Sequence, residues 1–172
     1  MSFKKLALTT ALIAGVSGMS INAMADASQE ITLQGIITST TCDVTVNGGK
    51  SVLNVGAFKS VDFEANQKLG SVTMPVALTN CAADEEGQLV VQGLTSVKNN
   101  DKNLFVENDA NTVGFMIADA NGDIITNNQE VAVEAKVGET TNYDFTVGMA
   151  STTLTPEPGV YSAPILVAYI VE

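Results

Sequence analysis

The 172-residue chain contains no histidine and no arginine, and it has only two cysteines. Without histidine, a Ser-His-Asp or Cys-His nucleophile system and an imidazole metal site are excluded. Two cysteines are too few for a four-cysteine zinc or iron–sulfur site within one chain. The carboxylates show no spacing that singles out a glycosidase pair. We therefore expect a protein that is not an enzyme, with no catalytic residues, no metal and no cofactor.

Charge is also scarce, and most of it is negative. Charged residues make up 16% of the chain, with 8 Lys+Arg against 19 Asp+Glu and a net charge of -11. Nucleic-acid binding needs cationic contacts to phosphate, and adsorption on anionic lipid needs basic patches. The composition therefore predicts no nucleic-acid partner and no adsorption on an anionic membrane surface.

The N-terminus has the three parts of a secretory signal peptide. Lys4 and Lys5 give a positive start, residues 6–16 form an apolar run, and Ala23 and Ala25 are the small residues at positions −3 and −1 of a signal-peptidase site. The apolar run is shorter than the roughly 20 residues that span a bilayer. A buried N-terminal helix is the alternative interpretation. We expect residues 1–25 to be a signal peptide and the mature protein to be exported.

Export determines how the two cysteines are interpreted. Cys42 and Cys81 are the only pair, and an exported chain meets an oxidising environment. We expect them to form a disulfide that removes roughly 4 kcal/mol of chain entropy from the unfolded state. Two free buried thiols are the alternative. A catalytic dithiol is disfavoured because the cysteines are far apart and form no C-x-x-C motif.

Period-2 alternation of apolar and polar residues dominates the mature sequence. It predicts short strands within residues 31–37, 72–78, 88–92, 113–117, 131–135, 143–147 and 160–171. Asn121 and Gly122 stand between two such runs and predict a hairpin turn. Polar stretches at residues 98–102 and 107–111 are typical of loops. The pattern predicts a single all-β domain of the sandwich class.

A calcium-binding loop is an alternative interpretation of the same hairpin region. Asp119, Asn121, Asp123 and Glu130 match ligand positions of an EF-hand loop, but Ile124 stands where that loop needs glycine. The flanking sequences also lack helical patterning. A hairpin turn explains these residues better than a metal site.

The last predicted strand is apolar on both faces, from Ala163 to Val171. Such a strand is expected in the interior of a fold, covered on both sides. Little sequence follows it that could supply a neighbouring strand. We expect the neighbour to come either from earlier in the chain or from a partner molecule that adds a β-strand.

Several motifs in order resemble fimbrial (pilus) subunits of the chaperone–usher pathway, the type 1 pilin-like superfamily. The resemblance covers nearly all of the mature chain and rests on the alternating start with its glycine, the Cys-x-Val motif, an L-G-like block, the strand that ends in L-x-x-C, a hairpin and the final strand. In this sequence the motifs are residues 31–37, 42–44, 52–57, 72–81, 114–122 and 159–171.

The resemblance implies an incomplete immunoglobulin-like β-sandwich that lacks its final strand and is completed by donor strand exchange. It implies a donor-strand extension at residues 26–37 and a pilin domain at residues 38–172. The implied partners are a periplasmic chaperone, an outer-membrane usher and neighbouring subunits of a homopolymer, and the implied location is the extracellular fimbrium on the cell surface. A minor adaptor, a terminator or a subunit that binds a host receptor is the alternative to a structural shaft subunit that supports cell adhesion.

The resemblance also implies two sets of site residues. The donor strand would present Ile31, Leu33, Gly35 and Ile37 to a neighbour's groove. The edge of the groove, which would also bind the chaperone, would comprise Ile165, Val167, Tyr169, Val171 and Glu172. The family usually has tyrosine at the penultimate position, where this chain has Val171. That departure puts the aromatic contact with a chaperone in doubt, although the carboxylate of Glu172 remains a candidate anchor.

Overall fold

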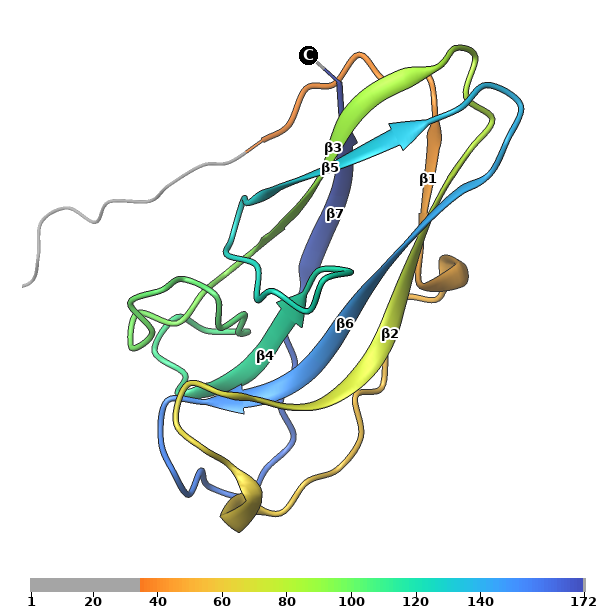
Figure 1. The fold of residues 1–172 in the computed structure, drawn as a ribbon. Coiled ribbons are helices and arrows are strands. Elements are labelled where there is room, and N and C mark those ends of the chain that lie inside the picture. Colours follow the sequence, from red (N-terminus) through yellow and green to blue (C-terminus); the bar gives the residue numbers. More distant parts are fainter. Residues whose placement is uncertain (1–34, 172) are drawn as a thin grey trace, which may run out of the picture. The chain divides into compact units, whose positions relative to one another are not determined.

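Within residues 35–171, the part of the chain that the computed structural model describes, seven strands form two sheets. The larger sheet has the order β1-β2-β6-β4 and comprises β1 (Asp43–Val46), β2 (Lys68–Thr79), β6 (Thr141–Ser151) and β4 (Val113–Ala118). The smaller sheet has the order β5-β3-β7 and comprises β5 (Glu130–Ala135), β3 (Glu85–Gly93) and β7 (Ile165–Ile170). Two short 3-10 helices lie in the connections, η1 (Asn47–Gly49) and η2 (Ser60–Asp62). The expected all-β sandwich is confirmed (Figure 1).

Alternating residues build the core between the two sheets. In β2, Met74, Val76 and Leu78 are buried, whereas Thr73 and Pro75 are exposed. The buried residues belong to one apolar cluster that takes members from both sheets. Because side chains alternate across a strand, the pattern that predicted the strand also determines which face meets the core.

The two cysteines form the expected disulfide. Cys42 precedes β1 and Cys81 follows β2, which are antiparallel neighbours, and the bond joins them across 39 positions of sequence. Both cysteines are buried in the core cluster. The bond therefore fixes the start of β1 against the end of β2, at the point where the chain enters the sandwich.

The predicted hairpin after β4 is also present. Asp119 and Ile125 donate backbone hydrogen bonds to Asp123 O and Ile117 O, both at 2.9 Å. Gly122 has a φ of 90°, which favours glycine at this position of the turn. Asp119 Oδ1 accepts the backbone N–H groups of Asn121 and Asp123, so this carboxylate stabilises the turn.

One side of the sandwich is closed by a segment that the alternation did not predict. Residues 104–106, which follow the loop after β3, are fully buried. Phe105 exchanges two backbone hydrogen bonds with Phe115 of β4, at 2.8 and 2.9 Å, and Val106 N–H donates to Leu94 O at 2.8 Å. This segment, the closing segment, therefore bridges from the end of β3 to the outer edge of β4.

None of the helices in residues 35–171 is long and apolar enough to cross a membrane.

Candidate strand-binding groove

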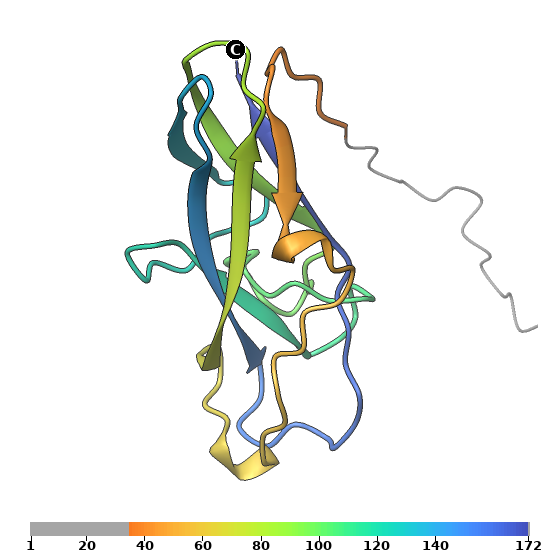
Figure 2. The same cartoon turned by 90° about the vertical axis from the view of Figure 1, so that its right-hand side faces the viewer.

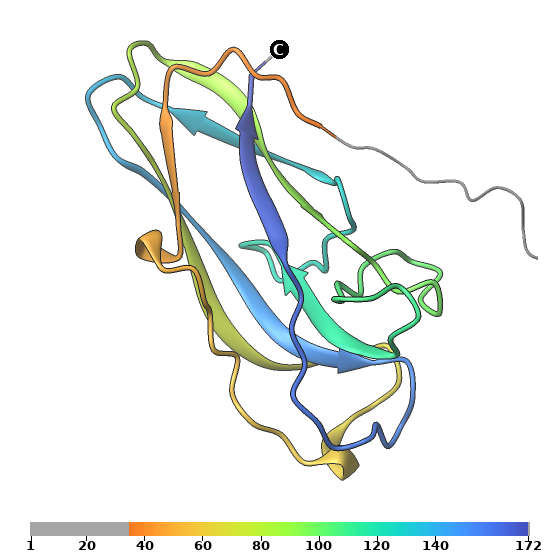
Figure 3. The same ribbon diagram turned by 180° about the vertical axis from the view of Figure 1, so that it is seen from behind.

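Within residues 35–171, the strand β7 is paired along one edge only. It is antiparallel to β3 from Ile165, opposite Gly93, to Ile170, opposite Gln88. Among residues 35–171, no backbone hydrogen bond reaches the other edge of β7. The free edge of β1, the first strand of the larger sheet, lies on the same side of the sandwich (Figures 2 and 3). The two sheets are therefore open toward each other along β7.

The expectation that β7 is covered on both faces is wrong in part. Leu166, on its outer face, is 56% exposed. The strand lies at the edge of a three-stranded sheet rather than in its interior. Leu166 stays outside because no element of the described chain packs over that face at its position. Of the two sources that the sequence left open for a second neighbour of β7, residues 35–171 supply none.

The inward residues of β7 form an apolar floor beside this open edge. Ile165, Val167 and Val171 are partly buried against the core cluster, and Tyr169 is 1% exposed. The Tyr169 hydroxyl donates toward two backbone carbonyls, Glu85 O at 3.2 Å and Val133 O at 3.1 Å. Burial raises the pKa of this hydroxyl, and the nearby Glu85 carboxylate adds to the rise. The floor is therefore apolar, and the hydrogen bonds of the buried Tyr169 hydroxyl hold it to the neighbouring backbone.

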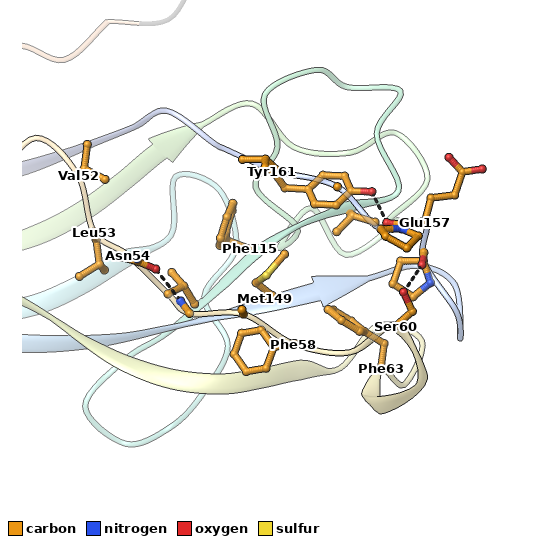
Figure 4. Close-up of a pocket in the computed structure, with 18 residues that line it drawn as sticks. Val52, Leu53, Asn54, Phe58, Ser60, Phe63, Phe115, Met149, Glu157 and Tyr161 are labelled. Atoms are coloured by element: carbon orange, nitrogen blue, oxygen red, sulfur yellow. Dashed lines mark hydrogen bonds between the residues drawn. The ribbon is translucent and has the colours of Figure 1, made fainter.

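A pocket of about 470 Å³ continues the groove at the end where β7 begins. Its walls are the segment that follows β1 and the segment that precedes β7, residues 52–60 and 156–161. The side chains of Phe58, Phe115, Met149 and Tyr161 gather around it, and the Tyr161 hydroxyl is turned away to donate to Glu157 O at 2.7 Å (Figure 4). The pocket is thus mostly aromatic and apolar, which suits an apolar side chain.

At the opposite end of β7, the residues that precede β1 cross the end of the strand. We call residues 35–41 the root segment, because they connect the domain to the N-terminal residues. The carboxylate of Glu85 holds this segment, accepting hydrogen bonds from Thr40 Oγ1 at 2.6 Å, Thr41 N at 2.7 Å and Thr41 Oγ1 at 2.5 Å. These bonds, that of the Thr40 side chain first, lower the pKa of Glu85.

The root segment also contacts the last residue of the open edge. Ser39 Oγ donates to Val171 O at 3.0 Å, and Val171 N–H donates to Thr38 Oγ1 at 3.2 Å. The root segment is therefore fixed both to β3, through Glu85, and to the end of β7.

The structure places the predicted site residues as follows. Ile165, Val167, Tyr169 and Val171 share one face at the open edge. Ile37 is 100% exposed, and a side chain at Gly35 would contact nothing within 4 Å. The remaining predicted residues, Ile31, Leu33 and Glu172, lie outside the described residues.

The sequence did not reveal the residues that lie at the two ends of the groove. Glu85 and the hydroxyls of Thr38 and Ser39 were not singled out, and neither was the aromatic residue Phe58 in the pocket. Phe58 follows the Gly56 block that the resemblance included, so that block was a usable signal. The hydroxyl-rich run at residues 38–41 was the other signal, although its partners are far away in sequence.

Comparisons with known proteins identify a family and several similar folds. The fimbrial protein family matches residues 31–169 of this chain, whereas no curated protein sequence matches it. Its fold is similar to that of the P pilus rod subunit PapA, with 12% identity, 76% of this chain and 99% of that chain covered, and a TM-score of 0.60. It is also similar to a Burkholderia pseudomallei antigen and type I fimbria protein, with 16% identity, 76% and 99% covered, and a TM-score of 0.56.

A third similar structure is that of a chaperone–usher pilus described for its rod uncoiling, with 12% identity, 86% of this chain and 97% of that chain covered, and a TM-score of 0.59. At these identities the solved structures show a shared fold, the incomplete sandwich. The family match spans most of the sequence and confirms the predicted resemblance. The chain therefore belongs to the fimbrial protein family, whose members are structural subunits rather than enzymes.

Proposed function

We propose that this chain is a structural subunit that polymerises into a surface fimbria, each groove receiving residues 26–37 of a neighbouring copy. The unpaired edge of β7, which lies beside an apolar floor, is the observation that carries the proposal. An open edge of this kind is a template for an added strand, which supplies backbone hydrogen bonds and buries alternate side chains. Residues 31–35 have the matching alternation of apolar and polar residues.

The position of the root segment favours a donor from another molecule. Every strand pair of the two sheets is antiparallel, so we expect the added strand to run antiparallel to β7 as well. The root segment leaves the domain beside Val171, where β7 ends. A chain that entered its own groove from that end would run parallel to β7. Antiparallel pairing therefore favours the N-terminal segment of a second copy, whose domain lies at the end where β7 begins.

This arrangement repeats without closing. The donor surface and the receiving groove are different parts of the molecule, so each contact is heterologous and leaves one free groove and one free segment. Heterologous contacts that do not close into a ring produce a fibre. Because the whole edge must separate at once for a copy to leave, the fibre is expected to be long-lived.

The same open edge accounts for the partners that the resemblance implies. A single copy with an unpaired apolar edge is prone to aggregation before it assembles. We infer that a periplasmic chaperone covers this edge, that an outer-membrane usher exchanges it for the next subunit, and that residues 1–25 direct export to this route. The cell-surface location follows from the same proposal.

A synthetic peptide of residues 26–37 tests the groove directly. At about a hundredfold excess over its Kd, the peptide should raise the free energy of unfolding of the purified chain by about 2.7 kcal/mol, measured by denaturant titration. A scrambled peptide of the same composition is the matched control. A Gly35→Leu peptide should bind less tightly, because the added side chain must fit where glycine is expected to approach the floor closely. Equal stabilisation by the scrambled peptide would refute a strand-specific groove.

A further inference from the structure

The end of the open edge is already occupied by two side chains of the same molecule. Ser39 Oγ donates to the carbonyl of Val171 at 3.0 Å, and the N–H of Val171 donates to Thr38 Oγ1 at 3.2 Å. One residue of a neighbouring antiparallel strand would bind this same pair of groups, accepting the N–H and donating to the carbonyl. The two hydroxyls therefore take the place of one residue of an added strand.

The backbone geometry shows which other groups remain free. In a strand, the N–H and C=O groups of successive residues point to opposite edges, so residues two apart point to the same edge. Since Val171 directs its N–H and C=O to the root segment, Tyr169, Val167 and Ile165 direct theirs to the same edge. No backbone hydrogen bond from residues 35–171 reaches these three residues on that side.

The residues that follow Thr38 and Ser39 in the chain are held to the domain by a carboxylate and a disulfide. Glu85, at the start of β3, binds the next two residues of the root segment, Thr40 and Thr41. The disulfide at Cys42 then ties the chain to Cys81. The root segment is consequently anchored within a few residues of Thr38 and Ser39. This anchoring favours their hydrogen bonds to Val171 being kept when an added strand pairs with the rest of the edge.

We propose that Thr38 and Ser39 form a hydroxyl plug that closes the groove at Val171 and sets the register of the incoming strand. The proposal rests on the proposed function, since it concerns the strand from a second copy. With the plug in place, that strand pairs with Ile165, Val167 and Tyr169 and stops there.

The plug disfavours the register in which Ile31 faces Val171, and the next register that keeps Ile31 and Leu33 on the inward face is shifted by two residues. If Ile31 faced Val171, it would lie where the hydroxyls already bind, and it would lose its backbone partner. A shift by two residues places Ile31 opposite Tyr169 and Leu33 opposite Val167, and it keeps both side chains over the apolar floor. Gly35 then lies opposite Ile165, and Ile37 lies beyond the start of β7, toward the pocket lined by Phe58 and Tyr161.

Amide hydrogen exchange of the purified chain, followed residue by residue by NMR with and without the 26–37 peptide, tests the plug. The test variant is Thr38→Val with Ser39→Ala, which removes both hydroxyls but leaves the peptide sequence unchanged. The matched control is Thr73→Val with Ser71→Ala, on the exposed face of β2, where neither hydroxyl makes a side-chain hydrogen bond within residues 35–171.

In the free chain, the Val171 amide should exchange about fivefold more slowly than in the test variant, the effect of one ordinary hydrogen bond. Adding the peptide should slow the amides of Ile165, Val167 and Tyr169 and leave that of Val171 unchanged. In the test variant the peptide should slow Val171 as well. The control variant should behave as the unmodified chain does.

The outcomes distinguish a failure of the plug proposal from a failure of the strand-binding groove. If the peptide slows the three amides but Val171 exchanges equally fast in the free chain and the test variant, the plug is wrong and the strand-binding groove stands. If the peptide slows none of the four amides, both proposals are overturned. A spin label on an Ile31→Cys peptide gives a second reading of the register, since it should broaden the signals of Tyr169 more than those of Val171. Stronger broadening at Val171 in the unmodified chain would overturn the plug.

Discussion

The two long sides of this sandwich differ in one respect, which is whether the chain itself closes them. On the β4 side, the closing segment at residues 104–106 pairs with Phe115 and Leu94 and is fully buried. On the β7 side, the edge has no backbone partner among residues 35–171 apart from β3. The closing segment occupies the edge of β4 that would otherwise be a template for strand addition, whereas within residues 35–171 the edge of β7 is still available. The apolar floor beside β7 is what favours this edge as the place for an added strand.

The difference between the two sides also means that one side affects the stability of the single copy and the other affects assembly. Side chains on the closed side are covered by their own molecule, so they stabilise the single copy. On the open side, Tyr169 is already buried, but Ile165, Val167 and Val171 are only partly covered until a strand arrives, so these three contribute mainly to the complex. Substitutions on the two sides should accordingly affect different measurements.

Phe105→Ala on the closed side should have the largest effect. Phe105 is 0% exposed and packs in the main core cluster, so its removal leaves a cavity at the point where the two sheets are bridged. We expect the free energy of unfolding of the purified chain to fall by about 3–5 kcal/mol, measured by denaturant titration. Val97→Ala, at a position that is 63% exposed in the same connection, is the control and should cost about 0.5 kcal/mol or less. A loss as small as the control's would show that the closing segment does not stabilise the fold.

Val167→Ala on the open side should have a smaller effect that shows mainly in the complex. Val167 is only partly buried in the single copy, and an added strand would cover it further. We expect the 26–37 peptide to bind about fivefold more weakly, while the unfolding of the free chain changes little. Isothermal titration calorimetry measures the first quantity and denaturant titration the second. If the free chain lost as much stability as the complex, the two sides would not differ in the way described.

Leu166→Ala is the matched control for this substitution. Leu166 belongs to the same strand but points to the outer face and is 56% exposed. Its truncation should change neither peptide binding nor unfolding by much. Weakened binding in this variant would mean that the peptide contacts the outer face of β7 rather than the groove.

The contrast between the two sides also explains what the sequence could predict. Alternation located β2, β5 and β6, because each of these strands has one face on the core and the pattern of the strand records that face. The closing segment escaped detection because three apolar residues between polar loops are too few to show a period. Their partners, Phe115 and Leu94, become neighbours only when the two sheets pack.

The boundaries of the groove were hidden for a related reason. The apolar final strand indicated an open edge only as one of two alternatives, and the resemblance to fimbrial subunits favoured that alternative. Glu85 and Thr40 are 45 positions apart, and their contact depends on where β3 starts relative to β1. The sequence predicted a strand at residues 88–92, whereas β3 begins at Glu85, so the carboxylate stood outside the predicted strand. Charged residues at strand ends carry no periodic signal that would reveal a partner.

The smallest expected effect concerns the anchor of the root segment, which lies at one end of the open side. Hydrogen bonds from Thr40 and Thr41 lower the pKa of Glu85 below its ordinary value of 4.5. A carboxyl whose pKa is lower in the folded chain adds stability above about pH 4.5, and this stability is lost as the pH falls through the folded-state pKa. We therefore expect the unfolding free energy of the unmodified chain to fall between pH 6 and pH 3 by more than that of Glu85→Gln.

Denaturant titrations of both proteins at these two pH values measure the difference, and Glu86→Gln serves as the control because Glu86 is the exposed neighbour on the same strand. The comparison between variants is needed because Asp84 also has a lowered pKa, through the backbone N–H of Val137, and contributes its own acid dependence to all three proteins. Since Glu85 is a surface carboxylate, the effect should be modest. An identical acid dependence in Glu85→Gln and the unmodified chain would mean that the root segment is held by the disulfide and the Val171 contacts alone, and that the open side has no carboxylate anchor at this end.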